Sequence, residues 1–134
     1  MLAGGKNLAD TLADFDAHLA AHGFKEEDFI FVTCGDFDIR TCLRKEADYK
    51  KIFLKDYMKR YINMKEVFKA AFSKQNDKGV GEKCSMVDML NHLKLPLEGR
   101  HHSGIDDSLN LAKIVVSLLQ QNIFFTKNYV KQIV

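Results

Sequence analysis

Apolar residues recur at the three- and four-residue spacing of amphipathic helices in two long parts of the chain. The first helix begins after Asn7, which can cap it, and can end at Gly23. The second covers about residues 105–119, and Asn122 is its expected stop. Between them, a capping-box pattern at residues 85–88 predicts a further, shorter helix.

Other segments have different signatures. Phe29–Thr33 is a run of five β-prone residues between a charged cluster and Gly35, which predicts a buried strand in a sheet covered on both faces. The secondary structure of residues 50–72 is ambiguous. Their pattern allows one long basic helix but does not require it. Residues 73–84 read as an exposed loop, and Ile123–Thr126 is a further candidate strand.

Length and composition predict one domain spanning residues 1–134, with 46% hydrophobic and 28% charged residues, as in globular proteins. The sequence has neither an apolar run long enough for a membrane span nor a signal-peptide pattern. Cys34, Cys42 and Cys84 are odd in number and lack metal-finger spacing, so we expect reduced thiols in an intracellular protein, cytoplasmic or nuclear.

Charge is unevenly distributed along the chain. The net formal charge is −5 over residues 1–43, +6 over residues 44–74 and +1 over residues 75–134. The basic middle block could attract a phosphate backbone. A solvated lysine-rich surface explains it equally well.

Two aspartates, Asp36 and Asp38, directly follow the predicted strand Phe29–Thr33. The carboxyl end of a buried strand is where α/β sheets place ligand sites, which makes both residues candidates for a site. The alternative is that one of them only caps the short helix that follows.

A second group of candidates lies at the start of the last long helix. Asp106 leads a stripe of polar residues and is expected to face solvent, whereas Asp107 leads an apolar stripe that faces the core. A carboxylate at the edge of a core needs a cation or hydrogen-bond donors. His102 lies five residues earlier and is suited to act as a general base. The alternative is a capped helix after a polar loop.

The segment Gly99–Asn110, GRHHSGIDDSLN, resembles the third sequence motif of the DEDDh 3′-5′ exonucleases, and especially that of the ERI-type exoribonuclease branch. The resemblance implies that His102 is the base that activates water and that Asp107 is a metal ligand. By the same resemblance, the neighbours His101 and Asp106 lack those roles.

The segment FVTCGDFDI resembles the second motif of the same superfamily, and this implies that Asp38, which follows the aromatic Phe37, is the motif aspartate. The segment YINMKEVF is similar to the strand and helix that follow this motif. The resemblance therefore favours a short strand at Tyr61–Met64 and a helix over about residues 65–72.

The implied fold is α/β and ribonuclease-H-like, with helices packed on a reduced sheet that lacks the three opening strands of the family. The first motif, Asp-x-Glu, is not found, and Asp14-Phe15-Asp16 comes closest without a Glu. The chain would then be the portion of an exonuclease domain that carries the second and third motifs.

The implied activity is 3′-5′ exonuclease, with RNA preferred, by phosphodiester hydrolysis with two Mg²⁺ or Mn²⁺ ions. Asp38 and Asp107 alone are too few anionic ligands for two ions, so we expect weak or absent ion binding and no activity from this chain by itself. The alternative is an inactive short paralogue that binds nucleic acid or a protein.

The expected partners are single-stranded RNA or a structured RNA 3′ end, with no membrane. A sheet without its opening strands would leave one edge of Phe29–Thr33 unpaired. Its residues include no Lys or Pro to discourage pairing with another chain. We therefore expect a homodimer through this exposed edge, or else rearrangement within the chain, with Ile123–Thr126 or Tyr61–Met64 pairing there instead.

Overall fold

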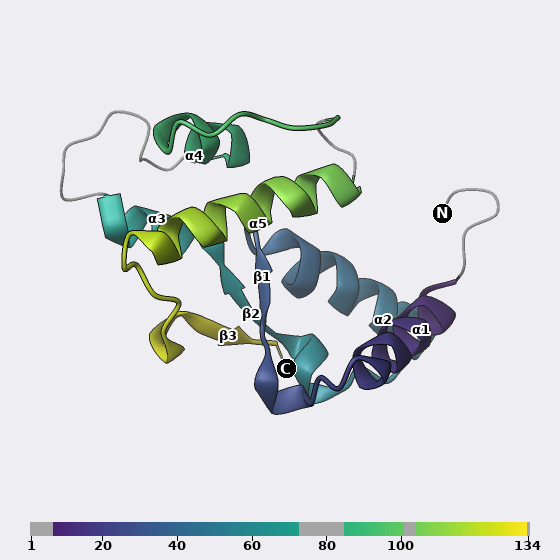
Figure 1. Ribbon diagram of the computed structural model, residues 1–134. Coiled ribbons are helices and arrows are strands. Elements are labelled where there is room, and N and C mark those ends of the chain that lie inside the picture. The colour runs from purple at the N-terminus through teal and green to yellow at the C-terminus, as the bar shows by residue number, and fades with distance from the viewer. Residues whose placement is uncertain (1–6, 73–84, 101–103, 134) are drawn as a thin grey trace.

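The computed structural model describes residues 7–72, 85–100 and 104–133 (Figure 1). Five α-helices and three strands lie within these ranges: α1 Leu8–Ala21, β1 Phe31–Thr33, α2 Arg44–Lys50, β2 Arg60–Asn63, α3 Met64–Phe72, α4 Met86–His92, α5 Gly104–Gln120 and β3 Val130–Gln132. A wide π-helical segment, Phe37–Leu43, leads directly into α2.

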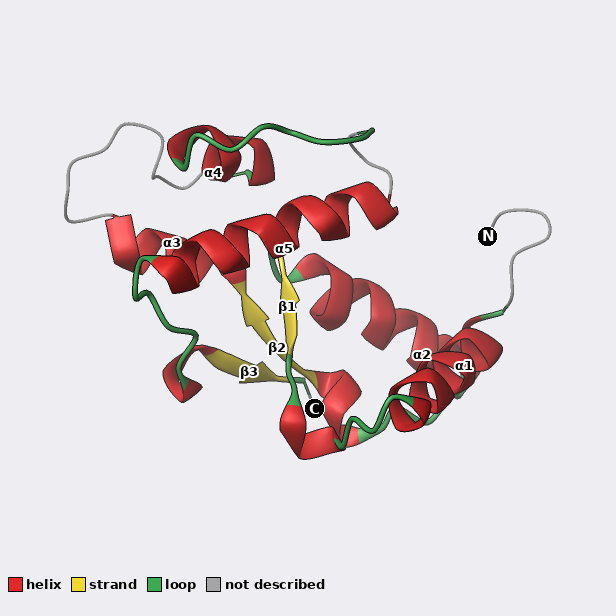
Figure 2. Ribbon diagram, viewed as in Figure 1, coloured by secondary structure: helices red, strands yellow, loops and turns green. Residues whose placement is uncertain are grey.

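The three strands form one small sheet in the order β1-β2-β3, with α5 and α4 above it and α1 and α2 to its right in the view of Figure 2. β1 is parallel to β2, with Phe31 opposite Tyr61, and β3 is antiparallel to β2. The expected strands at Phe29–Thr33 and Tyr61–Met64 are confirmed as β1 and β2, and so is the α/β fold with a reduced sheet. β1 is shorter than expected: its pairing with β2 begins at Phe31, and Phe29 is extended but lies outside the paired register.

The expectation of a strand at Ile123–Thr126 is wrong, because the third strand is Val130–Gln132. Ile123 and Phe125 instead turn their side chains onto the hydrophobic core, whereas Phe124 remains exposed. These residues therefore form a loop that packs on the core rather than a strand of the sheet.

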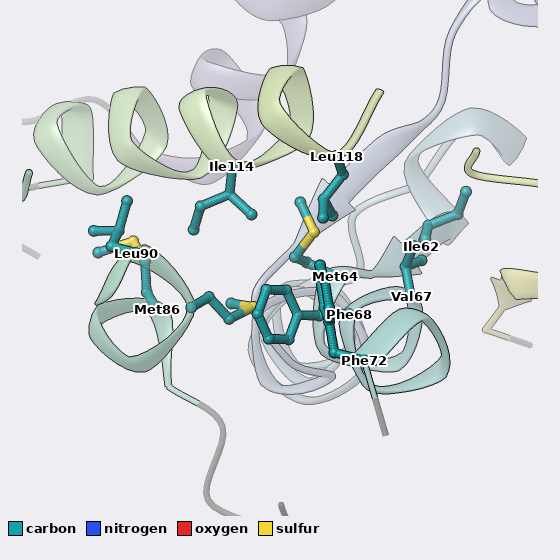
Figure 3. Close-up of a cluster of buried hydrophobic side chains, with 10 residues drawn as sticks. Ile62, Met64, Val67, Phe68, Phe72, Met86, Leu90, Ile114 and Leu118 are labelled. Carbon is teal, nitrogen blue, oxygen red and sulfur yellow. The ribbon is translucent and has the colours of Figure 1, made fainter. Parts of the chain in front are cut away.

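The main hydrophobic core lies between β2, α3, α4 and α5 (Figure 3). Ile114 and Leu118 of α5 point toward Phe68 of α3, and Leu90 of α4 lies against the same cluster. α4 begins with the expected capping box, in which Ser85 and Asp88 bond each other's backbone N–H groups. These contacts pack α4 and α5 against α3 and the sheet.

A second cluster joins α1 and α2 to the other end of the sheet, and its buried members are Ala47, Leu54, Tyr57, Met58, Tyr61 and Ile133. Asp16 of α1 accepts hydrogen bonds from Lys55 at 2.7 Å and from the Tyr57 hydroxyl at 2.9 Å. These bonds lower the pKa of Asp16. Burial, together with the bond to Asp16, raises the pKa of Tyr57. None of the residues of α1 is fully buried, so α1 is attached by these polar contacts together with the partly buried Leu12 and Leu19, which pack against the second cluster.

Candidate functional site

A cavity of about 730 Å³ lies at the carboxyl end of β1, between the segment that follows β1, the start of α4 and the start of α5. Asp38 and Asp107 both line it, although they are far apart in the sequence. The remaining lining residues are Phe31, Val32, Thr33, Cys34, Ile39, Ser85, Met86, Gly104, Ser108 and Leu111. The fold thus brings together two of the three residues singled out from the motifs.

The turn after β1 determines where Asp38 lies. Gly35 has a φ of 112°, which a residue with a side chain rarely adopts. Its N–H donates to Asn63 Oδ1 at 3.0 Å, and the Thr33 hydroxyl donates to its carbonyl oxygen at 2.6 Å. Because Asn63 ends β2, the sheet itself fixes this turn and so places Asp38 in the first turn of the helical segment that follows.

Asp36 has different surroundings. Its carboxylate accepts hydrogen bonds from the Tyr61 hydroxyl at 2.6 Å and from Lys131 Nζ at 3.2 Å, and Lys131 also pairs with Glu66. Burial raises the pKa of Asp36, but the bonds from Tyr61 and Lys131 outweigh it and leave the pKa below its usual range. Asp36 therefore joins the helical segment to β2 and β3 and makes no side-chain cap.

The lowered pKa of Asp36 predicts acid sensitivity. A carboxyl group whose pKa is lower in the folded protein stabilises the fold above its unfolded pKa, about 3.9, and that stabilisation is lost as pH falls through the folded value. We expect Asp36→Asn to be less stable than the native protein at pH 7 and to lose less stability between about pH 5 and pH 2. Urea unfolding across this range measures the effect, and parallel curves for the two proteins would contradict it.

Asp107 lies in the first turn of α5 and is half-buried at the cavity. Asp106 differs from expectation: it is partly buried, and its carboxylate accepts the Arg100 backbone N–H at 2.8 Å. A Cβ added at Gly99, whose φ is 70°, would collide with this same carboxyl group. Asp106 therefore holds the loop that precedes α5, and the expectation that it faces solvent is wrong.

Two further members of the polar stripe on α5, Asn110 and Lys113, continue this role. Asn110 is fully buried, accepts the Glu98 N–H at 3.1 Å and donates to the Glu98 carbonyl at 2.9 Å. Lys113 donates to the Pro96 carbonyl at 3.0 Å. The loop backbone therefore runs antiparallel along α5 and is bonded to it at three places. This loop leads to residues 101–103, so His102 lies outside the described residues.

Cys34 also lines the cavity, and sequence reasoning did not select it as a site residue. The two-residue period of a strand predicts that Cys34 faces the same side as Ile30 and Val32. All three side chains pack against the main hydrophobic core. Burial raises the pKa of the Cys34 thiol, and the negative charges of Asp38 and Asp107 also raise it. Cys34 and Cys42 are both free thiols, as expected, while Cys84 lies outside the described ranges.

Carboxylate oxygens are the ligands that Mg²⁺ and Mn²⁺ prefer, so Asp38 and Asp107 fit the chemistry of such ions. Within the described ranges, however, no group of three or more His, Cys, Asp or Glu side chains is arranged to hold a metal ion. Asp38 and Asp107 alone could therefore supply only part of the ligands that such an ion needs. No helix in the same ranges has the length and apolar character needed to cross a membrane.

The sequence has clear relatives, although no protein-family model matches it. It is 34% identical to human ERI1 exoribonuclease 3 over 127 residues, which is 93% of this chain and 36% of the relative. It is 30% identical to the Drosophila melanogaster 3′-5′ exonuclease Snipper over 96 residues, 72% of this chain and 32% of the relative. The chain thus spans about a third of the length of these relatives.

Solved structures show the same fold. The cell-death related nuclease 4 (CRN-4) superposes with a TM-score of 0.74 at 24% identity over 82% of this chain and 37% of that chain. A full-length 3′-exonuclease superposes with a TM-score of 0.75 at 19% identity over 98% of this chain and 59% of that chain.

Sheet, cavity and relatives together define the class as a ribonuclease-H-like exonuclease domain, of which this chain matches a part. The chain belongs to the DEDDh 3′-5′ exonuclease superfamily, and its relatives are of the ERI type. The resemblance read from the two motifs is thereby confirmed.

Proposed function

We propose that this chain is the portion of a 3′-5′ exonuclease domain that carries the second and third motifs, and that RNA is the preferred substrate. The observation that carries the proposal is the meeting of Asp38 and Asp107 in one cavity at the end of β1. The named activities of the relatives agree with it, since the human and Drosophila proteins are an exoribonuclease and a 3′-5′ exonuclease.

In this proposal Asp38 and Asp107 are metal ligands and His102 is the base that takes a proton from the attacking water. Mg²⁺ or Mn²⁺ would supply charge stabilisation for the attacking and leaving oxygens of the phosphodiester. The turn at Gly35 and Asn63 orients Asp38. The bonds from α5 to the loop at 96–100 position the segment that leads to His102.

We also propose that these 134 residues hold the ions weakly or not at all by themselves. Two carboxylates are too few for two divalent ions, and the sequence contains no Asp-x-Glu. The nearest sequence is Asp14-Phe15-Asp16, but it lies in α1, where Asp16 is bonded to Lys55 and Tyr57. The free thiols Cys34 and Cys42 agree with an intracellular location.

Incubation of labelled single-stranded RNA with the pure chain and Mg²⁺ or Mn²⁺ tests this proposal. We expect no detectable shortening by the 134 residues alone, because the metal site is incomplete. A protein form in which a strand carrying Asp-x-Glu precedes these residues should remove nucleotides from the 3′ end, and His102→Ala should abolish that activity. Robust degradation by the 134 residues that depends on His102 would contradict the proposed incompleteness.

The outer edge of β1 favours self-association. Within the residues that the structure describes, no strand pairs with this edge, since β2 pairs only with the other one. Beside it lies an apolar groove of about 410 Å³, lined by Ile30, Phe31, Val32 and the α5 residues Ser108, Leu111, Ala112, Val115 and Val116. An unpaired edge next to an apolar groove is a surface that another chain can cover.

We expect the chain to form a two-fold dimer in which the β1 strands of two copies pair antiparallel. Sedimentation velocity at micromolar concentration measures this. Val116→Lys, in the exposed part of the groove, should give a folded monomer, whereas Lys127→Glu, outside the groove, should leave the dimer unchanged. A native chain that is strictly monomeric and unfolds cooperatively would rule out this dimer.

A further inference from the structure

The end of α2 presents two aromatic side chains to solvent. Tyr49 is 87% exposed and Phe53 is 83% exposed, the two highest values among the exposed large hydrophobic residues of the described ranges. They stand on either side of Lys51, whose left-handed backbone ends the helix. Two large aromatic side chains exposed this close together in the sequence make the end of α2 a candidate contact surface.

The backbone that carries these rings is well anchored. Ala47 and Leu54, on either side of the turn, are both buried in the second cluster. The Ile52 N–H donates to the Ala47 carbonyl at 2.8 Å, which closes the turn. The rings therefore project from an ordered part of the fold, and their exposure is a property of the folded surface.

The same surface is basic. Residues 44–60 include seven Lys or Arg against three Asp or Glu. Lys50 and Lys55 are neutralised by Glu46 and Asp16, each at 2.7 Å. Among the described residues, three further lysines, at positions 45, 51 and 59, form no salt bridge. Lys59 Nζ lies 6.0 Å from the centroid of the Phe53 ring, which brings a cation and an aromatic face together.

Exposed flat rings between unneutralised lysines match the chemistry of a single nucleic-acid strand, whose bases stack on aromatic faces and whose phosphates pair with cations. We propose that Tyr49, Lys51, Phe53 and Lys59, here called the α2-end surface, bind single-stranded RNA outside the Asp38 and Asp107 cavity. The inference rests on the proposed function, because it extends the path of that substrate.

The fold also sets the distance between the two sites. Asp38 and Tyr49 belong to one continuous helical segment, formed by Phe37–Leu43 and α2. Eleven residues at no more than about 1.5 Å each place them at most roughly 16 Å apart along its axis, since the wide π-helical turns rise less per residue than α-helical ones. At about 3.4 Å per stacked nucleotide, roughly five nucleotides would span this distance. A strand whose 3′ end lies in the cavity would then reach the α2-end surface, whereas a trinucleotide would not.

Fluorescence anisotropy with a labelled single-stranded RNA of about twelve nucleotides tests the proposal on the full chain. Tyr49→Ala and Phe53→Ala should each weaken binding about tenfold or more, because stacking of one base contributes on the order of one to two factors of ten in affinity. Phe53→Tyr keeps an aromatic face and should restore binding. Lys51→Gln should reduce the slope of log K against log salt by about 0.7.

Phe124→Ala is the matched control, since Phe124 is 59% exposed and lies outside the basic segment. It should leave RNA binding unchanged, and circular dichroism should show that all variants fold. The proposal is overturned if the native chain does not bind the RNA, if Tyr49→Ala and Phe53→Ala bind normally, or if Phe124→Ala weakens binding equally. The proposal would also be overturned if the substitutions at Tyr49 and Phe53 weakened binding to anionic vesicles but did not change binding to RNA.

The same variants separate this inference from the proposed function. If both aromatic variants bind RNA normally and the form that carries Asp-x-Glu cleaves RNA, then only the proposal of the α2-end surface is overturned. Ring-dependent RNA binding without cleavage by that form overturns the exonuclease proposal alone.

Discussion

Replacement of Asn110 by alanine is expected to lower the free energy of unfolding by about 2–4 kcal/mol. The Asn110 side chain is fully buried and bonds both the N–H and the carbonyl of Glu98. Its removal leaves two backbone groups without partners, and each buried unpaired group costs on the order of 1–3 kcal/mol. Urea unfolding followed by far-UV circular dichroism measures the loss.

Asn91→Ala is the matched control, since Asn91 is an exposed asparagine on α4. Its effect should stay within about 0.5 kcal/mol, as is usual for surface positions. A loss below about 1 kcal/mol in Asn110→Ala would mean that water replaces the lost bonds and that the loop is not held by this residue. A large loss would identify Asn110 as a positioning residue for the loop that leads to His102.

Local signals in the sequence were sufficient for much of the fold. The capping residue Asn7 and the capping box at Ser85 bond as their positions predicted, because both interactions join residues that are three apart. Asn122 follows α5 with a φ of 62°, as expected of a helix stop. The β-prone run before Gly35 was also readable, since composition alone separates it from a helix.

Partners that are distant in sequence were not readable. Asp36 and Asp38 follow the same strand, so their positions in the sequence do not distinguish them. They differ in the structure because Asp36 bonds Tyr61 and Lys131. The strand at Val130–Gln132 exists because β2 has an edge for it, which no local pattern encodes.

The polar stripe on α5 shows the same limit in another form. Polarity at helical spacing indicates a face that needs hydrogen bonds, but it does not say whether water or backbone provides them. Here the backbone of the loop at residues 96–100 provides the hydrogen bonds. The stripe led by Asp106 therefore binds another part of the same chain. This stripe and Asp107 lie on neighbouring faces of α5. The helix that places the Asp107 carboxylate in the cavity therefore also holds the loop leading to His102.

Neutralisation of either cavity aspartate should have the largest effect on activity. In a protein form that includes an Asp-x-Glu strand, we expect Asp38→Asn and Asp107→Asn each to slow 3′-end removal by at least about 10²-fold, because charge stabilisation by the metals is worth several kcal/mol. Asparagine has nearly the same shape as aspartate and keeps one carbonyl oxygen, so the fold should persist. Single-turnover cleavage of labelled RNA in Mn²⁺ measures the rate, and thermal unfolding checks the fold.

Asp48→Asn removes an exposed carboxylate on α2 and should leave the cleavage rate unchanged. Asp36→Asn is the more demanding comparison, since Asp36 and Asp38 were both candidates for the second-motif ligand. We expect it to lower stability, through loss of its bonds to Tyr61 and Lys131, with less effect on the rate at saturating Mn²⁺ than Asp38→Asn. If Asp36→Asn abolishes cleavage while Asp38→Asn remains active, the ligand is Asp36, and the cavity between β1 and α5 is not the metal site.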